Sequence, residues 1–407
     1  MIVTLIYSLL FIVLLAWIGY FTITMWNSYH LPLLTKKTKN VKPKNQPLVS
    51  VIIPARNEEK RIASCIKTLK MQTYPNLEII IVDDFSTDNT PEKAKESING
   101  DNRFILLKLS DNSQKKPVEW TGKSYAMHQG RQQAHGEWLL FTDVDYMDHE
   151  PELIERAIEH VLNKKIDLLS LIPRHICKSF WEKIIQPIPL GLIPAISPLS
   201  RANKPDSNVA IAFGCFIFIR QSVYDSVGGY KVIRGHIADD AAMAKLVKQA
   251  GFKLGLARGQ QLMKIRMYEG FHEIWEGWSK NIFLGVVQKR EIKSKIQKSL
   301  FVGAGSLGIF GLMVFPFLMM ILSLIMMFFT RTLFWQNLTI LSIIIWIIVT
   351  ILHFIVQNTY QIGKPYYAPL AFLGGIITMG IFLNSAIKSL SGTGVRWKDR
   401  IYTDSNN

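Results

Sequence analysis

The sequence predicts an α/β protein in which a doubly wound, mostly parallel sheet lies between membrane-spanning helices. In the first half of the 407-residue chain, short apolar runs alternate with stretches of helical periodicity, and each run ends in polar residues. This alternation is typical of strand–helix–strand units. The 49% of residues that are hydrophobic are concentrated at the two ends, in long uncharged runs. Such runs indicate membrane spans rather than core helices.

The N-terminal run covers residues 2–26, which include no charged side chain. A helix of this length can cross the ~30 Å hydrocarbon core of a bilayer. A secretory signal would show a basic start, a shorter apolar region and a small-residue cleavage site, and these features are missing here. We therefore expect an uncleaved anchor over residues 1–28, followed by a basic juxtamembrane linker over residues 29–47.

The C-terminal quarter holds three further apolar blocks, at residues 301–329, 338–354 and about 368–387. They predict two to three transmembrane helices within residues 301–390. The first block contains Pro316 and exceeds the ~20 residues that a span needs, so it either crosses with a kink or tilt or lies partly in the interface.

Lysine and arginine residues flank both membrane regions. They are Lys36, Lys37, Lys39, Lys42 and Lys44 after the first anchor, and Lys289, Arg290, Lys293, Lys295 and Lys298 around the segment 286–300. The positive-inside rule then places residues 27–300 in the cytoplasm, in a multi-pass protein of the plasma membrane. The net charge of +16 is interpreted as adhesion to anionic lipid. We expect no nucleic-acid partner, because the basic clusters adjoin spans and lack interleaved aromatic residues.

A basic tail over residues 391–407 follows the last apolar block and contains Arg396, Lys398 and Arg400. Three complete C-terminal spans would put this tail outside the cell. If the first block does not cross, the tail stays inside, and the sequence leaves both topologies open.

Within the central region, the apolar runs predict individual strands and the periodic stretches predict helices. Strands are expected at residues 48–54, 77–82, 104–107, 168–172 and 209–219. A helix is expected over residues 60–71, and Ser86 and Thr87 are expected to cap a helix that starts near Pro91. Neither a Gly-x-Gly-x-x-Gly fingerprint nor a Walker loop is present, which argues against dinucleotide and P-loop nucleotide binding.

Two acidic residues, Asp143 and Asp145, directly follow the apolar run Trp138–Phe141. In an extended backbone, residues two apart point the same way, so both carboxylates can face the crevice at the carboxyl end of a parallel sheet. Two carboxylates there suit a hard divalent cation shared with a diphosphate. A solvated turn is the plainer alternative.

Two more acidic pairs stand at predicted element ends. Asp83 and Asp84 follow the apolar run Ile79–Val82, where carboxylates can accept hydrogen bonds from a nucleoside. Asp239 and Asp240 precede a predicted helix, where the helix dipole alone would favour them.

Four motifs in order resemble the family 2 glycosyltransferases of the GT-A fold, over about residues 48–285. They are Pro54-Ala55-Arg56-Asn57-Glu58-Glu59, Val82-Asp83-Asp84-x-Ser86-x-Asp88, Trp120-x-Gly122-Lys123 and Asp143-x-Asp145. The motifs Trp275-Glu276-Gly277-Trp278 and Trp397-Lys398-x-Arg400-x-Tyr402 are most similar to bacterial lipid-directed members, namely carotenoid-acid glycosyltransferases and hopanoid-associated relatives. The Gln-x-x-Arg-Trp motif of polymerising relatives is missing.

The resemblance implies a role for each candidate site residue. The nucleotide sugar would be bound by Glu58, Asp83, Asp84, Lys123 and Asp143. Asp145 would hold Mg²⁺ or Mn²⁺, and Asp240 would be the general base of an inverting transfer.

Four further residues would lie near the acceptor or the diphosphate, namely Asp239, Trp275, Trp278 and Lys280. Asp239 departs from the glutamate that the family carries at this place. The two tryptophans fit equally well an amphipathic helix at the membrane interface.

The expected function is transfer of a hexose from a UDP-sugar to a membrane lipid or isoprenoid at the cytoplasmic leaflet. A carotenoid acid and a hopanoid-type lipid are the candidate acceptors. The alternatives are a processive polysaccharide synthase and a non-catalytic membrane scaffold.

Overall fold

The chain divides into two compact units. The computed structural model describes residues 2–36, 46–112, 117, 119–120, 123–144, 146–147, 149–236, 238–289, 295–391, 393, 395–397 and 400–402. The sheet unit comprises His30–His175 and Pro198–Met267, and the membrane unit comprises Met1–Tyr29, Ile176–Ser197 and Tyr268–Asn407.

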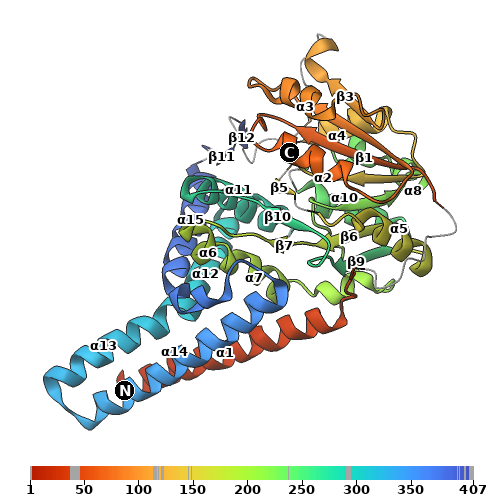
Figure 1. Cartoon of the computed structure of the whole chain (residues 1–407). Coiled ribbons are helices and arrows are strands. Elements are labelled where there is room, and N and C mark those ends of the chain that lie inside the picture. The colour runs from red at the N-terminus through yellow and green to blue at the C-terminus, as the bar shows by residue number, and fades with distance from the viewer. Residues whose placement is uncertain are drawn as a thin grey trace. The chain divides into compact units, whose positions relative to one another are not determined.

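A seven-stranded sheet forms the centre of the sheet unit (Figure 1). Its strands in sequence are β1 (Val49–Ala55), β2 (Leu77–Asp83), β3 (Phe104–Lys108), β4 (Trp138–Phe141), β6 (Leu168–Ile172), β8 (Ile217–Arg220) and β9 (Leu254–Arg258). Their order in the sheet is β3-β2-β1-β4-β8-β6-β9. Only β8 runs against its neighbours, so the predicted mostly parallel sheet is confirmed.

Helices pack against this sheet because its strands are apolar on both faces. They are α2 (Ile62–Lys70), α3 (Thr90–Ile98), η1 (Leu109–Asn112), α4 (Ser124–Gln132), α5 (Leu153–Lys164), η2 (Leu199–Asn203), α8 (Gln221–Ser226), α9 (Gly229–Val232) and α10 (Asp239–Gln249). Residues such as Ile52, Ile53 and Ile80 are fully buried, as expected for parallel strands covered by helices. A small sheet, β5 (Tyr146–Met147), β10 (Lys264–Arg266) and β7 (Arg174–His175), accompanies it in the order β5-β10-β7.

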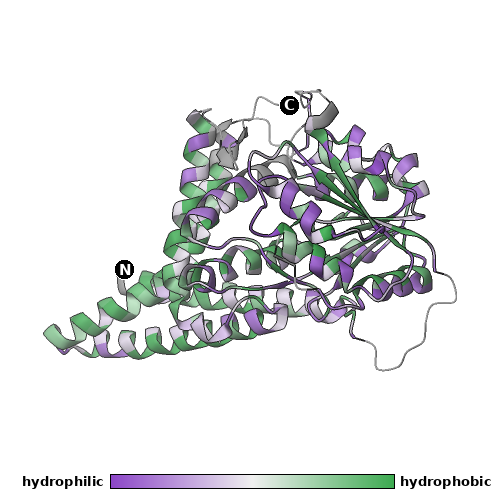
Figure 2. Cartoon of the chain, turned by 45° about the horizontal axis from the view of Figure 1, so that its top comes forward, coloured by the Kyte–Doolittle hydropathy of each residue, from purple (hydrophilic) through white to green (hydrophobic). Residues whose placement is uncertain are grey.

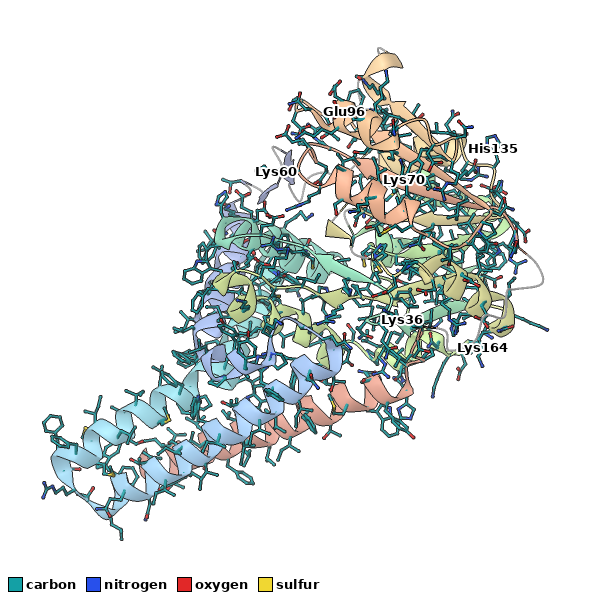
Figure 3. All side chains as sticks on the ribbon, viewed as in Figure 1. Lys36, Lys60, Lys70, Glu96, His135 and Lys164 are labelled. Atoms are coloured by element: carbon teal, nitrogen blue, oxygen red, sulfur yellow. The ribbon has the colours of Figure 1, made fainter. Side chains whose placement is uncertain are left out.

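The segment that follows α1 (Ile2–His30) covers the edge strand β9. Arg258 N donates to the Pro32 carbonyl at 2.7 Å, and Leu34 N donates to the Arg258 carbonyl at 2.9 Å. Lys36, labelled in Figure 3, then pairs with Glu150 at 2.6 Å. This cover uses the hydrogen-bonding groups that an edge strand otherwise leaves open.

The cap of α3 differs from the prediction. Asp88 Oδ1 accepts from Thr90 N at 3.0 Å, at the start of the helix. Ser86 and Thr87 do not cap it. Ser86 Oγ instead accepts from Asn57 N at 3.0 Å, and Thr87 N donates to Asn57 Oδ1 at 2.9 Å. These side chains join two loops rather than end a helix.

The strand predicted over residues 209–219 is shorter than expected, because β8 covers only Ile217–Arg220. The preceding residues bond to side chains instead of a neighbouring strand. Phe213 N donates to Ser170 Oγ at 2.8 Å, and the Cys215 carbonyl accepts from Thr142 Oγ1 at 2.7 Å. Gly214 N donates to a carboxylate of α10, Asp240 Oδ2, at 3.1 Å. The apolar pattern of the run therefore reflects a packed loop.

Long apolar helices make up most of the membrane unit. They are α1, α12 (Lys295–Ile309), α13 (Phe315–Thr330), α14 (Leu333–Tyr360) and α15 (Ala371–Ser391). In the part of the chain that the structure describes, four stretches are long and apolar enough to cross a membrane: Thr4–His30, Val302–Thr330, Leu333–Tyr360 and Pro365–Lys388. In Figure 2 the ribbons of these helices are mostly green, the colour of hydrophobic residues. One N-terminal and three C-terminal helices of spanning length are thus present.

The rest of the unit consists of short elements and one longer helix. These are α6 (Phe180–Ile185), α7 (Pro187–Ile196), α11 (Phe271–Lys289), the π-helical turn η3 (Phe310–Val314), η4 (Pro365–Leu370), β11 (Val395–Trp397) and β12 (Arg400–Tyr402). The proline-rich stretch 180–199 is therefore largely helical. Its first helix is fixed by a capping box between Ser179 and Glu182.

Side chains of α1 satisfy two carbonyls that prolines deprive of their usual donors. Pro316 has no N–H to donate to Leu312, four residues earlier, and Trp17 Nε1 donates to the Leu312 carbonyl at 2.8 Å. Pro198 likewise cannot donate to Pro194, whose carbonyl accepts from Asn27 Nδ2 at 2.7 Å. The N-terminal helix therefore completes the hydrogen bonding of both proline-containing segments.

Candidate active site

The strand order reverses beside β1, and we call the carboxyl edge of the sheet at this point the crevice. The chain proceeds from β1 to β2 and β3 on one side, whereas β4 pairs with β1 on the other. Ligands of open α/β sheets bind where the strand order reverses in this way. Asp84 directly follows β2 on one side of this crevice and Asp143 follows β4 on the other.

Hydrogen bonds join the loops that follow β1 and β2, and these loops contain three of the predicted site residues. Asp84 N donates to the Ala55 carbonyl at 2.7 Å, and Arg56 Nη1 donates to the Asp84 carbonyl at 3.0 Å. Glu58 N donates to Thr90 Oγ1 at 2.7 Å. The resulting ledge holds Glu58, Asp83 and Asp84, all buried.

Asp83 is a buried carboxylate that lacks part of its hydrogen bonding. Its Oδ2 accepts from Ser86 N at 3.4 Å, and its Oδ1 has no partner among the described residues. Burial raises the pKa of Asp83 above its usual value, the hydrogen bonds from Ser86 oppose this shift, and neighbouring Asp84 adds to it. An unsatisfied buried oxygen is costly, so this position favours a ligand that donates a hydrogen bond.

Two residues of the ledge have left-handed backbone conformations, Asn57 with φ 52° and Phe85 with φ 56°. Asparagine tolerates this region, whereas a bulky aromatic residue rarely occupies it. Such outliers persist where the surrounding structure enforces them, often next to functional sites. Phe85 stands directly between Asp84 and Ser86, so the strain lies within the ledge itself.

A second group of predicted residues meets across the crevice. Lys123 forms an ion pair with Asp143, and both side chains are 27% exposed. Gly214 N donates to Asp240 Oδ2 at 3.1 Å. A Cβ placed on Gly214 would lie 3.4 Å from Lys123 Nζ and 3.6 Å from Asp240 Oδ2. The start of α4, the end of β4 and the start of α10 therefore converge there.

Asp239 completes this group, and we call Asp143, Asp239 and Asp240 the acid cluster. Asp239 is buried, its Oδ1 accepts from Asp240 N at 3.1 Å, and its Oδ2 has no partner among the described residues. Burial raises the pKa of Asp239 to about 6, Lys123 opposes that shift, and the charges of Asp240 and Asp143 add to it.

The acid cluster also controls the ionisation of Lys123. Burial alone would lower the pKa of Lys123, but the charges of Asp143, Asp239 and Asp240 outweigh burial and raise that pKa above its usual value. Lys123 therefore stays charged at any physiological pH, as a cation surrounded by carboxylates.

Tyr230, which the sequence did not indicate as a candidate site residue, lies near the acid cluster. Its ring meets that of Phe141, the last residue of β4, with centroids 5.0 Å apart, and its hydroxyl has no partner among the described residues. Burial raises the pKa of Tyr230 well above its usual value, and the Asp239 charge adds to this shift. The sequence signal for Tyr230 is the glycine pair that precedes it, Gly228-Gly229. Both glycines have positive φ, and a Cβ on Gly229 would lie 2.1 Å from the Tyr224 ring, so glycine is required there.

Four predicted residues remain. Asp145 is outside the described residues. Trp275, Trp278 and Lys280 belong to α11 in the membrane unit. There Trp278 is buried with its ring edge-on to Tyr268 at 6.3 Å. A Cβ on Gly380 of α15 would lie 3.1 Å from the Trp275 ring. Both tryptophans therefore contact other residues of their own unit.

His236, which shortly precedes α10, is exposed. Among the described residues, no group of three or more His, Cys, Asp or Glu side chains has metal-binding geometry.

Comparisons with known proteins point to a family and to a fold. The model of the family described as glycosyl transferase family 2 matches residues 50–228. A 4,4'-diaponeurosporenoate glycosyltransferase of Staphylococcus haemolyticus (strain JCSC1435) is 29% identical over 263 residues, which cover 64% of this chain and 67% of the relative. Its namesake in Staphylococcus aureus (strain USA300) is 30% identical over 254 residues, 62% and 64% of the two chains. The alignments thus span about two thirds of these relatives.

A solved structure supports the fold. A mannosyltransferase from Pyrobaculum calidifontis, in complex with GDP-Man and Mn²⁺, superposes with a TM-score of 0.53 at 16% identity, over 95% of this chain and 99% of that chain. Residues 50–228 are therefore similar to the family 2 glycosyltransferases, and the chain has a GT-A-like fold.

Proposed function

We propose that this protein is an inverting glycosyltransferase that moves a hexose from a UDP-sugar to a membrane lipid or isoprenoid. The observation that carries the proposal is the convergence of Lys123 and the acid cluster at the carboxyl edge of the sheet. The names of the two staphylococcal relatives, which refer to diaponeurosporenoate, support an isoprenoid acid as one acceptor.

The ledge would bind the nucleoside part of the donor. Asp84, with Asp83 and Glu58 beside it, offers carboxylate oxygens to ribose hydroxyls or to the imide of a uracil. The partly unsatisfied carboxylate of Asp83 supports this assignment, because a donated hydrogen bond would offset the cost of its burial.

The diphosphate would lie between the ledge and the acid cluster. We assign Asp145 as the ligand of Mg²⁺ or Mn²⁺, since carboxylate oxygens are the ligands that such hard cations prefer, and Asp143 as a residue that meets the ribose or the donor sugar. The excess of carboxylates over cations around Lys123 fits a site for positive charge. When bound, the ion offsets the charge that develops on the leaving diphosphate.

Asp240 would act as the general base. Its Oδ2 already accepts a hydrogen bond from Gly214 N at 3.1 Å, which fixes the carboxylate at the crevice. The acceptor hydroxyl transfers its proton to Asp240 while its oxygen attacks the anomeric carbon from the side opposite the diphosphate. The new C–O bond forms as the bond to the diphosphate breaks, so UDP leaves and the configuration inverts.

The membrane unit would keep this chemistry next to an apolar acceptor. Four helices of spanning length would hold the protein in a bilayer, and from the flanking lysines and arginines we assign the catalytic region, residues 48–285, to the cytoplasmic side. Trp275, Trp278 and Lys280 of α11 are assigned to the acceptor side.

The acceptor chemistry gives the decisive experiment, with Asp240→Asn and two classes of lipid acceptor. An alcohol must lose a proton, so the variant should transfer hexose to it about 10²- to 10⁴-fold more slowly. A carboxylic acid is already ionised at neutral pH, so its loss should be much smaller. Transfer would be measured with radiolabelled UDP-sugar and protein in nanodiscs containing either acceptor. If wild-type protein neither transfers nor hydrolyses any UDP-hexose with Mg²⁺ or Mn²⁺, the proposed function is wrong.

A further inference from the structure

Lys123 holds an unusual position for a residue that is to bind a diphosphate. Its ammonium is already paired with Asp143, and Asp239 and Asp240 also act on it. Asp143 contacts the ammonium directly. Gly214 lies between the ammonium and Asp240, since a Cβ on Gly214 would lie 3.4 Å from Lys123 Nζ and 3.6 Å from Asp240 Oδ2. A divalent cation that entered this cluster would meet a resident positive charge.

The backbone of Lys123 is fixed although its ammonium is at the end of a flexible stem. Met127 N donates to the Lys123 carbonyl at 3.0 Å in the first turn of α4. That helix packs closely on the sheet, since a Cβ on Gly130 would lie 2.6 Å from Ile52 Cγ2. Trp120, just before the lysine, stacks on His128 of the same helix with ring centroids 5.0 Å apart. A lysine side chain can still change partners by rotating its four-carbon stem.

We propose that Lys123 is a tethered counter-cation, which neutralises the acid cluster in the donor-free protein and transfers to the donor diphosphate when nucleotide and divalent cation bind together. This inference rests on the proposed function and names the order of its binding events. A divalent cation alone must displace the ammonium, which then has no new anionic partner. With a nucleotide diphosphate present, the ammonium exchanges one anion for another.

Lys123 therefore couples the binding of metal to the binding of nucleotide. Each ligand strengthens binding of the other by the same factor, because coupling free energies are reciprocal. Lys123 acts here as a positioning residue, through Asp143 and through the diphosphate.

The test is Lys123→Met, with Mn²⁺ binding followed by the loss of the free-ion electron paramagnetic resonance signal. Mn²⁺ alone should bind the variant about 3- to 10-fold more tightly than wild type, because a like charge has been removed from a partly exposed site. UDP in the presence of Mn²⁺ should bind the variant more weakly. These two changes have opposite signs, which loss of a merely structural ion pair would not produce.

Two further variants complete the design. Lys245→Met on α10 removes the same charge from an exposed position, and it should change neither affinity by more than about twofold, as is usual for an exposed charge. Lys123→Gln can still donate a hydrogen bond to Asp143 but has no charge, so it should behave like Lys123→Met and replaces it if that variant does not fold. Unchanged or weaker binding of Mn²⁺ alone to the folded variant overturns the inference. If wild-type protein binds no UDP even with Mn²⁺, the proposed function fails instead.

Discussion

Phe85 lies in the ledge and has a strained backbone conformation. Its φ of 56° costs a non-glycine residue about 1–2 kcal/mol. Phe85→Gly should therefore raise the free energy of unfolding by about 1 kcal/mol, part of the gain being offset by the greater chain entropy of glycine. Denaturant unfolding of the purified protein, followed by tryptophan fluorescence, measures this. Equal or lower stability of the variant would show that the ring contributes more by packing than the backbone loses.

Glu78, a residue of β2, is expected to make stability depend on pH. It accepts from His135 N at 2.6 Å and from Gly136 N at 3.1 Å, and it also bonds Ser50. Burial alone would raise the pKa of Glu78, but the hydrogen bonds from Ser50 and His135 outweigh burial and lower it. His135 is labelled in Figure 3.

Because this pKa is lower in the folded state, the stabilisation is complete above the unfolded pKa of about 4.3 and is lost as pH falls through the folded value. Glu78→Gln should cost about 1–3 kcal/mol at pH 7, and the difference from wild type should shrink below pH ~4. Thermal unfolding of both proteins across this pH range tests the prediction. A difference independent of pH would assign the effect to packing.

Candidate site residues could be predicted from the sequence where their own side chains and neighbours in the chain indicate a role. Residues that reach the candidate site only through the fold could not be predicted. The carboxylates of Asp84, Asp143 and Asp240 were found because they end apolar runs or begin a helix. Tyr230 and the amide of Gly214 were not, because their proximity to the acid cluster depends on contacts between segments far apart in sequence.

A side-chain hydrogen bond joins α1 to the π-helical turn η3. Trp17 Nε1 donates to the carbonyl of Leu312, which Pro316 cannot serve. Trp17→Phe should lower the free energy of unfolding by about 1–3 kcal/mol, because a part-buried carbonyl loses its donor.

The same change made in a Pro316→Ala background should cost less, since the new backbone N–H can serve Leu312. Unfolding of the two single variants and the double variant in detergent completes the cycle. Thr22→Ala is the matched control, because Thr22 bonds only within α1 at an exposed position. Equal costs of Trp17→Phe in both backgrounds would contradict the explanation.

An element could be predicted from the sequence where its apolar run is compatible with a single kind of structure. The strands over residues 49–55 and 168–172 matched because parallel strands buried on both faces read as continuous apolar runs. The run over residues 209–219 did not match, since side chains of Thr142, Ser170 and Asp240 took the hydrogen bonds that a neighbouring strand would have supplied. Such competition is not encoded in the run itself.

For the whole molecule, the expectation to test is the side of the membrane on which the sheet unit lies. Lys60 and Lys70, labelled in Figure 3, belong to that unit. In a variant without the three native cysteines, a cysteine at either position should react with an impermeant maleimide only after cells are permeabilised, if the positive-inside rule holds. Labelling of intact cells would place the sheet unit outside and refute the cytoplasmic assignment.

Three segments of the chain make up the membrane unit, and the middle one, Ile176–Ser197, is an insert between two parts of the sheet unit. The backbone of this insert packs closely against α15, because a Cβ on Gly374 of α15 would lie 1.9 Å from the carbonyl oxygen of Ile184. Trimming both apolar ends to obtain a water-soluble fragment would thus strip this insert of the helices that cover it, leaving buried side chains such as Ile185 and Ile188 bare. Soluble versions of the enzyme call for excision of the insert as well as of the ends.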